Sequence, residues 1–454
     1  MMARDMTKGN PAVELFWFSL PLVGSGLLQQ LFQWADAFIV GRAEGELALA
    51  ALGSTFTILS ILLLVITGLT QGVSLLAAQR FGDGRREELR PILASFVLAL
   101  PLAAATASFV GILFAEQALL LLKTPEEMFA MAKDYLCFYL PGMPFTALYN
   151  VYAGVLRGMG DSKASFLAVM VSSAVNIALD LLLVVVFPFG AAGAAAATAL
   201  SQLLMALWVV WYTGQKYPFL RLRGEKAALK GTLVFAGLAL GAPIALQQSI
   251  SSLANLILQR FMNGFGPSTV AAITTAYRVD VLIMLPILNL GAGISTMVAQ
   301  NVGAGNRRRA ERCLLWGMGM AAVCSVVLTL FVTTLGAHCI ALFGVGEEAV
   351  AIGGRFFRVI GRFYLLYGLS TALGGYLQGV GDVSFTGGVN ILSRGVRIVL
   401  SYAWALWLGN MVIAWAEIVS WAVMLALYGL RFFRLRRRER LSNAAGSCIL
   451  KDES

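Results

Sequence analysis

The sequence predicts an all-α polytopic membrane protein with twelve transmembrane helices, in two six-helix bundles related by pseudo-two-fold symmetry along the membrane normal. Three observations support this fold class. The 454 residues are 59 % hydrophobic and 13 % charged, with a mean hydropathy of +0.78, whereas a soluble domain is about 25 % charged. The apolar residues form twelve long runs. Finally, two separated motifs recur at one constant offset.

Each apolar run is long enough to cross a bilayer, which takes about 20 residues. The expected spans are 13–40, 47–79, 91–122, 130–156, 164–187, 190–214, 232–262, 268–300, 312–336, 349–379, 385–407 and 411–433. A polar, basic stretch at 214–231 interrupts them near the middle of the chain. We therefore expect an N-terminal lobe at 1–213, a cytoplasmic linker at 214–231, a C-terminal lobe at 232–434 and a cytoplasmic tail at 435–454.

The chain contains an internal duplication. QGVSLLAAQRFGDG at 71–84 matches AGISTMVAQNVGAG at 292–305, and GVLRGMGD at 154–161 matches GYLQGVGD at 375–382, both at an offset of 221. Two sets of six spans that start on the same side are parallel repeats, which is a transporter architecture. We interpret the glycines of these motifs as tight turns at helix ends, because no Gly-Lys-Ser/Thr phosphate loop follows them.

The net charge of +10 does not indicate a nucleic-acid partner, because the basic residues gather at one set of span ends. This distribution places both termini in the cytoplasm of a multi-pass inner (plasma) membrane protein. We expect a monomer that contacts the lipid bilayer. The N-terminal apolar run is too long for a signal peptide, so we expect no cleavage.

Composition also argues against an enzyme. The five cysteines form no CxxC motif and His338 is the only histidine, so zinc and Cys/His catalysis are disfavoured. We find no convincing nucleophile and expect no cofactor. The chain contains no ATP-binding domain, so an ion gradient or the membrane potential would have to supply energy.

Two carboxylates lie inside apolar spans. Asp36 interrupts LLQQLFQWADAFIVG at 27–41, and a charge at that depth costs at least a few kcal/mol, which indicates function. Asp180 lies in the fifth span. Both belong to polar helix faces, which are Ser25, Gln29, Gln33 and Asp36 in the first span, and Ser172, Asn176 and Asp180 in the fifth.

The second half of the chain serves as a control for these acids. At the offset of 221, Asp36 corresponds to Ile257 (Leu258 if the register slips by one) and Asp180 corresponds to Ser401. If the two acids only packed the fold, both halves should have them. Their presence in the first half alone favours a functional role. Two carboxylates and an amide carbonyl can replace the water shell of Na⁺. Alternatively, two carboxylates in a low dielectric can share one proton.

Prolines and arginines complete the candidate residues. Pro21 and Pro243 lie at nearly equivalent places in the first and seventh spans and predict deformable helices, or hinges. Arg394 and Arg397 share a face of the eleventh span. We favour ion pairing of these arginines with Asp280 or Glu417, and the alternative is binding of an anionic substrate.

The chain resembles the multidrug and toxic compound extrusion (MATE) family over nearly its whole length. The resemblance rests on Pro21 followed by DAFIVG at 36–41, on LALAALG at 47–53, on the paired glycine loops, and on LRGMGDS and LQGVGDV. It implies an antiporter that exports amphipathic, often cationic, organic compounds in exchange for Na⁺ or H⁺.

The resemblance also implies a cation site made by Asp36, Asn176 and Asp180, with Thr198 as an accompanying hydroxyl. One branch of the family has acids in its seventh and tenth spans, but this sequence has none at 232–262 or between Arg355 and Gln378. The chain therefore resembles the branch with its cation site in the N-terminal lobe.

Several alternatives stay open at this point. A flippase for a lipid-linked saccharide or cell-wall precursor shares the fold, and Arg394 and Arg397 would then bind pyrophosphate. A substrate cavity is plausible around a set of polar and aromatic side chains, although packing explains each of them as well: Gln29, Gln33, Trp34, Tyr139 and Asn150. The sequence does not separate Na⁺ from H⁺ coupling.

Overall fold

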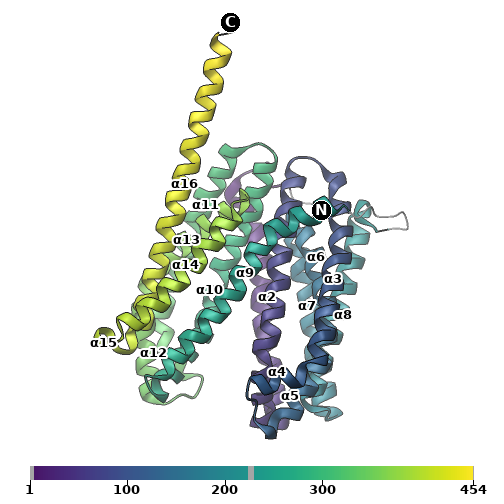
Figure 1. Ribbon diagram of the computed structural model, residues 1–454, viewed down its shortest axis with the longest axis vertical. Coiled ribbons are helices and arrows are strands. Elements are labelled where there is room, and N and C mark those ends of the chain that lie inside the picture. The colour runs from purple at the N-terminus through teal and green to yellow at the C-terminus, as the bar shows by residue number, and fades with distance from the viewer. Residues whose placement is uncertain (1–4, 223–229, 453–454) are drawn as a thin grey trace. The chain divides into compact units, whose positions relative to one another are not determined.

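The computed structural model describes residues 5–222 and 230–452, with no β-strand among them. Figure 1 follows the helices in chain order. They are α1 (Pro11–Glu44), α2 (Glu46–Gly82), α3 (Leu89–Leu113), α4 (Ala115–Leu121), α5 (Glu126–Tyr139), α6 (Met143–Gly158), α7 (Ser162–Asp180), α8 (Gly190–Lys216), α9 (Gly231–Asn263), α10 (Pro267–Gly303), α11 (Arg307–Ala341), α12 (Glu347–Ile360), α13 (Tyr364–Gly379), α14 (Val383–Ala403), α15 (Ala405–Leu408) and α16 (Val412–Asp452). The linker bases Arg223 and Lys226 lie outside the described residues.

The predicted spans correspond to these helices, and the all-helical membrane fold is confirmed. Nine helical segments of the described chain are long and apolar enough to cross a bilayer. The fourth, tenth and eleventh predicted spans are not among these nine. Two of them are broken in the middle, into α5–α6 and α12–α13, and the third is α14, which carries Arg394 and Arg397.

The breaks themselves follow the repeat. Short 3₁₀ turns at Leu140–Gly142 and Gly361–Phe363 divide the fourth and tenth spans at equivalent positions, again 221 residues apart. The flanking helices α5 and α12 begin and end at matching residues, as do α6 and α13. Proline at position 141 cannot donate a backbone hydrogen bond, which favours the break in the first half.

An aspartate that ends each repeated GxGD motif ties the motif to the last helix of its half. Asp161 accepts hydrogen bonds at Oδ2 from Lys216 Nζ (2.8 Å) and the Tyr217 hydroxyl (2.8 Å). In the second half, Arg431 Nε donates to Asp382 Oδ2 at 2.7 Å. The glycines before these aspartates, at 160 and 381, have φ angles of 86° and 93°, as expected for tight turns.

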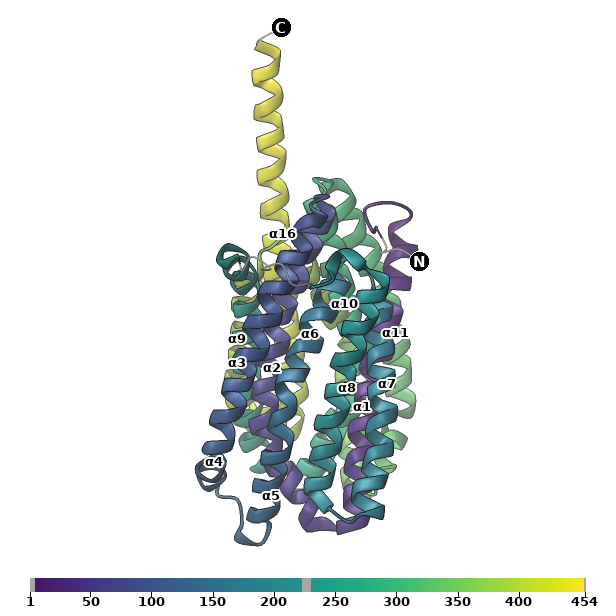
Figure 2. The ribbon, with the colours of Figure 1, turned by 90° about the vertical axis from the view of Figure 1, so that its right-hand side faces the viewer.

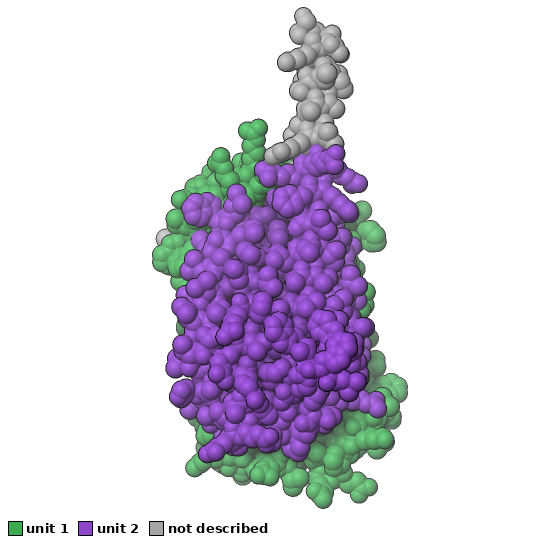
Figure 3. Space-filling view, turned by 90° about the vertical axis from the view of Figure 1, so that its left-hand side faces the viewer, with its two compact units in different colours: residues 1–252, 296–313 green, residues 253–295, 314–454 purple. Residues whose placement is uncertain are grey.

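The compact units do not coincide with the two halves of the sequence. One unit comprises Met1–Ser252 and Thr296–Cys313, and the other comprises Leu253–Ser295 and Leu314–Ser454 (Figure 3). The first two thirds of α9, up to Ser252, belong to the first unit because small residues let this backbone approach α2, where a Cβ at Gly72 would collide with Gly241. The lobes predicted at 1–213 and 232–434 describe the two sequence repeats, and their existence as separate lobes stays a prediction.

Within the first unit, the ends of α2 and α10 cross at reciprocal glycines. A Cβ on Gly82 would collide with the carbonyl of Gln300, and a Cβ on Gly303 would collide with the carbonyl of Gln79. Gln300 also donates from Nε2 to the Gly158 carbonyl (2.7 Å) and accepts from the Met6 amide (3.1 Å). The repeated motif thus provides a close backbone crossing as well as a turn.

We expect Gly303→Ala to lower the free energy of unfolding by about 1–3 kcal/mol, because the added methyl group forces the two helix backbones apart. The measurement is thermal unfolding of the detergent-solubilised protein. Gly319→Ala in α11 is the matched control, since no described atom lies within 4 Å of its Cβ position. That control should gain about 1 kcal/mol from helix propensity, and equal behaviour of the two variants would refute the crossing.

Candidate functional site

The site forms where α7 packs against both α1 and α8, and the three helices run side by side in Figure 2. Asp161 begins α7 by accepting a hydrogen bond from the Ala164 amide at 3.3 Å, which satisfies a free N–H at the helix start. At the other end of α7, Asn176 and Asp180 lie one turn apart and are 1 % and 0 % exposed. The helix thus presents an amide and a carboxylate on one buried face.

The oxygen atoms of this face lack partners. Both carboxylate oxygens of Asp180, Oδ1 of Asn176 and Oδ1 of Asp36 are buried and accept no hydrogen bond from any described residue. Asn176 uses its Nδ2 to donate to the Thr198 hydroxyl of α8 at 3.4 Å, which leaves its oxygen free. Buried acceptors normally have partners, so this cluster suits a hard cation or a proton.

The structure brings the four predicted cation-site residues together from α1, α7 and α8. The Asp36 and Asp180 carboxylates are close enough to interact electrostatically, and Thr198 is hydrogen-bonded to the same face of α7. Among the described residues, no three His, Cys, Asp or Glu side chains cluster as metal ligands. The four residues offer carboxylate, amide and hydroxyl oxygens, which are the ligands that hard cations prefer.

The backbone changes its hydrogen-bond pattern directly after Asp180. Residues Leu181–Val186 form a π-helix, whereas α14 continues as a regular helix through the equivalent Ser401 to Ala403. π-Helical turns are rare and occur often at functional sites. The run LLLVVV contains no signal for this change, so the sequence did not predict it.

Tyr135 is a site residue that the sequence analysis missed. It is buried on α5 in the neighbourhood of Asp36 and Asp180, and it stacks on Tyr139 with ring centroids 5.7 Å apart. The repeat contained the signal, because the residue 221 positions later is Phe356, which lacks the hydroxyl. Comparison of the two halves at aromatic positions would have revealed it.

Glu44 fixes the end of α1 against the start of α8. Its Oε2 accepts a hydrogen bond from the Ala191 amide at 2.9 Å, and the preceding Gly190 has a φ angle of 63° and no room for a Cβ beside this carboxylate. A carboxylate is favourable at a helix N-terminus. This contact anchors α1 about two turns beyond Asp36.

The predicted substrate residues are more scattered. Gln29 and Gln33 are exposed on α1, with Trp34 39 % exposed beside them. Asn150 donates to the Thr146 carbonyl of its own helix at 2.8 Å, and Tyr139 lies in the ring stack described above. No cavity described below is lined by any of these five side chains, and their role in substrate binding stays a prediction.

The predicted hinges lie inside unbroken helices. Both α1 and α9 continue through Pro21 and Pro243. Each proline removes one backbone hydrogen bond from the helix. Bending at these two positions stays a prediction.

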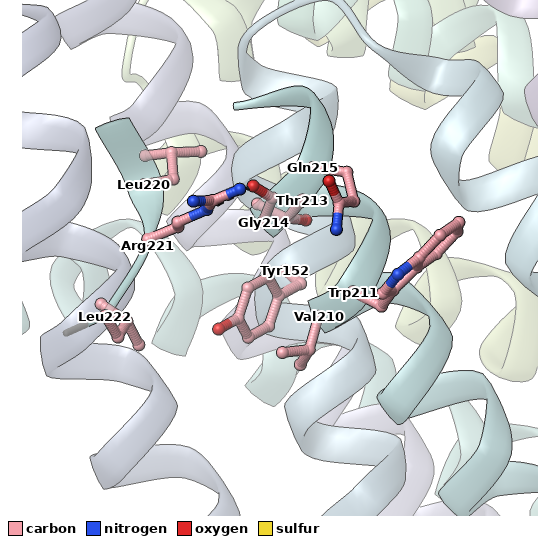
Figure 4. A pocket seen from close by; sticks show the side chains of 9 residues that line it. All are labelled: Tyr152, Val210, Trp211, Thr213, Gly214, Gln215, Leu220, Arg221 and Leu222. Carbon is pink, nitrogen blue, oxygen red and sulfur yellow. Dashed lines mark hydrogen bonds between the residues drawn. The ribbon is translucent and has the colours of Figure 1, made fainter. Parts of the chain in front are cut away.

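A cavity of about 570 Å³ lies at the end of α8, away from the carboxylates (Figure 4). It is lined by Tyr152, Val210, Trp211, Thr213, Gly214, Gln215, Leu220, Arg221 and Leu222. Its one charged side chain, Arg221, donates from Nε to the Gly214 carbonyl at 2.6 Å. The described lining contains no Asp or Glu, so this cavity offers no carboxylate for ion coupling.

A polytopic helical fold with unpartnered carboxylates inside its spans is typical of membrane proteins that move ions, protons or solutes. The family comparison agrees with that class. The MatE family model matches residues 21–182 and 243–403, and the chain belongs to this family of small-molecule transporters.

Relatives and solved structures extend the match over most of the chain. The chain is 30 % identical to the probable multidrug resistance protein YpnP of Bacillus subtilis, over 90 % of this chain and 92 % of the relative. It is 27 % identical to the probable multidrug resistance protein YoeA of the same organism, over 87 % and 88 %. The crystal structure of MATE in complex with MaL6 matches with a TM-score of 0.90 at 22 % identity, covering 96 % and 100 % of the two chains.

Proposed function

We propose that this protein is a secondary-active antiporter that exports amphipathic or cationic organic compounds in exchange for Na⁺ or H⁺ by alternating access. The observation that carries the proposal is the cluster of unpartnered oxygens on Asp36, Asn176 and Asp180 inside the membrane spans. Membership of the MatE family supports it. So do the relatives YpnP and YoeA, which are named as probable multidrug resistance proteins.

The chemistry of coupling follows from the two carboxylates. With the cation or proton bound, the site carries less negative charge and α1 can pack on α7. When the ion leaves, two like charges remain at close range in a low dielectric, and their repulsion disfavours the same packing. The missing hydrogen bond at Pro21 and the π-helix after Asp180 make the backbone on both sides easier to deform.

The placement of the site supports the branch with an N-terminal cation site. The four oxygen-bearing residues belong to α1, α7 and α8, all in the first half of the sequence. Neither α9 nor α13 contains an Asp or Glu. We further propose cytoplasmic termini, a plasma-membrane location and a monomer, with the basic span ends as the support for the orientation.

The flippase alternative gains no support from the arginines. A pyrophosphate site would need both Arg394 and Arg397, but Arg397 Nη2 lies 3.0 Å from Glu417 Oε2 and is neutralised there. For Arg397, the predicted ion pair is therefore confirmed. A pyrophosphate would also be repelled by Asp280 nearby.

Proteoliposomes distinguish the two coupling ions. We expect efflux of a fluorescent organic cation such as ethidium to follow an imposed Na⁺ gradient or an imposed pH gradient, and to stop when both gradients are collapsed. Dependence on Na⁺ alone assigns the oxygen cluster to Na⁺, and dependence on pH alone assigns it to a shared proton. Transport at an undiminished rate with neither gradient would refute secondary-active coupling.

A further inference from the structure

A second cavity, of about 310 Å³, lies inside the second compact unit among α9, α10, α13, α14 and α16. Its apolar lining includes Met262, Met284 and the ring pair of Tyr367 and Trp421, whose centroids are 5.1 Å apart. Cavities that bind small molecules start at about 300 Å³ and are mostly apolar with a few placed polar groups. This cavity therefore has the size and lining for a small aromatic or aliphatic solute.

Two of the four charged side chains in the lining neutralise each other. Arg397 and Glu417 form an ion pair of 3.0 Å, with side chains only 4 % and 9 % exposed. Arg397 also donates to the Tyr277 hydroxyl, which lies 3.4 Å from Glu417 Oε2. The Glu417 carboxylate therefore offsets the charge of Arg397, although Arg397 Nε is buried without a hydrogen-bond partner among the described residues.

The other two charges are not paired with each other. Arg394 lies one helical turn before Arg397 and lines the cavity. It is attracted by the Glu417 carboxylate, which already pairs with Arg397, and forms no hydrogen bond or ion pair of its own with any residue that the structure describes. Asp280 accepts a hydrogen bond at Oδ1 from the neutral Tyr364 hydroxyl at 2.5 Å. An unpaired guanidinium within a membrane span is costly, and such a residue is a functional-site candidate.

We propose that this cavity binds an amphipathic solute with one singly charged anionic group, a carboxylate or a phosphodiester. Arg394 holds the anionic group, because a guanidinium binds such oxygens through two parallel hydrogen bonds. Tyr367 and Trp421 pack against the apolar part. Asp280 in the same lining limits the bound ligand to a single negative charge, since a second one would meet a carboxylate.

This site is distinct from the ion-coupling site. Asp36, Asn176, Asp180 and Thr198 belong to the first compact unit, whereas every residue lining this cavity belongs to the second. Binding here needs no transport and can be measured when coupling is lost. The anionic group could come from a soluble organic anion or from an anionic lipid headgroup, and the experiment below separates the two.

The test compares dansylglycine with its uncharged amide, dansylglycinamide, by fluorescence titration of the full chain in a neutral detergent. We expect the wild-type protein to bind the carboxylate about tenfold more tightly than the amide. Arg394→Gln should remove this preference and leave amide binding unchanged. Arg355→Gln, an exposed arginine of α12 outside the cavity, should keep the preference.

Two results would overturn the proposal. One is a carboxylate preference that survives Arg394→Gln. The other is an equal loss of affinity for both dansyl compounds in Arg394→Gln, which would indicate disturbed packing. Asp180→Asn should keep the preference, and its loss there would refute the separation of the two sites.

Nanodiscs of phosphatidylcholine, with and without phosphatidylglycerol, identify the source of the anion. Competition by phosphatidylglycerol that disappears in Arg394→Gln assigns the site to a lipid headgroup. An unchanged carboxylate preference in both nanodiscs assigns it to a soluble anion.

Discussion

We expect Asp180→Asn to abolish ion-coupled efflux while the protein still folds and inserts into the membrane. The side chain is 0 % exposed and neither of its oxygens has a described partner, so the substitution breaks no structural hydrogen bond. It does remove one of the two carboxylate charges that we propose to bind the coupling ion. Efflux driven by an imposed gradient should fall to the level of empty vesicles, and full efflux in reconstituted vesicles would refute the site.

The internal repeat supplies matched controls for this experiment. Ile257→Ala changes the position equivalent to Asp36, and Ser401→Ala changes the position equivalent to Asp180. Both should leave coupling close to wild type, because the second half has no carboxylate at either place. A loss in Ile257→Ala equal to that in Asp36→Asn would show that the asymmetry between the halves does not report function.

Glu417→Gln is expected to lower the free energy of unfolding by about 3–5 kcal/mol. The substitution leaves the Arg397 guanidinium charged at 4 % exposure, and breaking a buried pair from one side costs this much. The measurement is unfolding of the purified protein in detergent, followed by circular dichroism. Glu116→Gln is the control, because its pair with Lys133 has the same distance of 3.0 Å but is exposed, and its loss should be below about 1 kcal/mol.

Removal of both charges at once shows whether the instability of Glu417→Gln comes from the unpaired Arg397 charge. The double variant Arg397→Met with Glu417→Leu should be close to wild type in stability or above it, since hydrophobic groups of similar volume often replace a buried ion pair without loss. If the double variant is as unstable as Glu417→Gln alone, the cost arises from packing around α16 and not from an unpaired charge.

Much of the fold is local and was therefore predictable. Hydropathy reports which segments are apolar, and the twelve spans followed from it. The offset of 221 also anticipated equivalent helix ends, and even the 3₁₀ breaks at Leu140–Gly142 and Gly361–Phe363 obey it. Asp36, Asn176 and Asp180 were visible because a charged or amide group is expensive in an apolar span and because the second half lacks the acids.

Other features of the site depend on neighbours that are distant in the chain. Glu44 meets the start of α8 across 147 residues, and Tyr135 lies near the two carboxylates although it belongs to a different helix, α5. The π-helix after Asp180 has no distinguishing composition. Of two arginines on one face of α14, only Arg397 meets a carboxylate from α16.

The sequence by itself determined the membrane class, the spans, the duplication and the candidate acids, because periodicity, hydropathy and the cost of a buried charge act along the chain. Only the tertiary structure decided which oxygens lack partners, which arginine is left unpaired beside a cavity, and that α9 is shared between two compact units. Those properties depend on distances between side chains of different helices, and packing sets these distances.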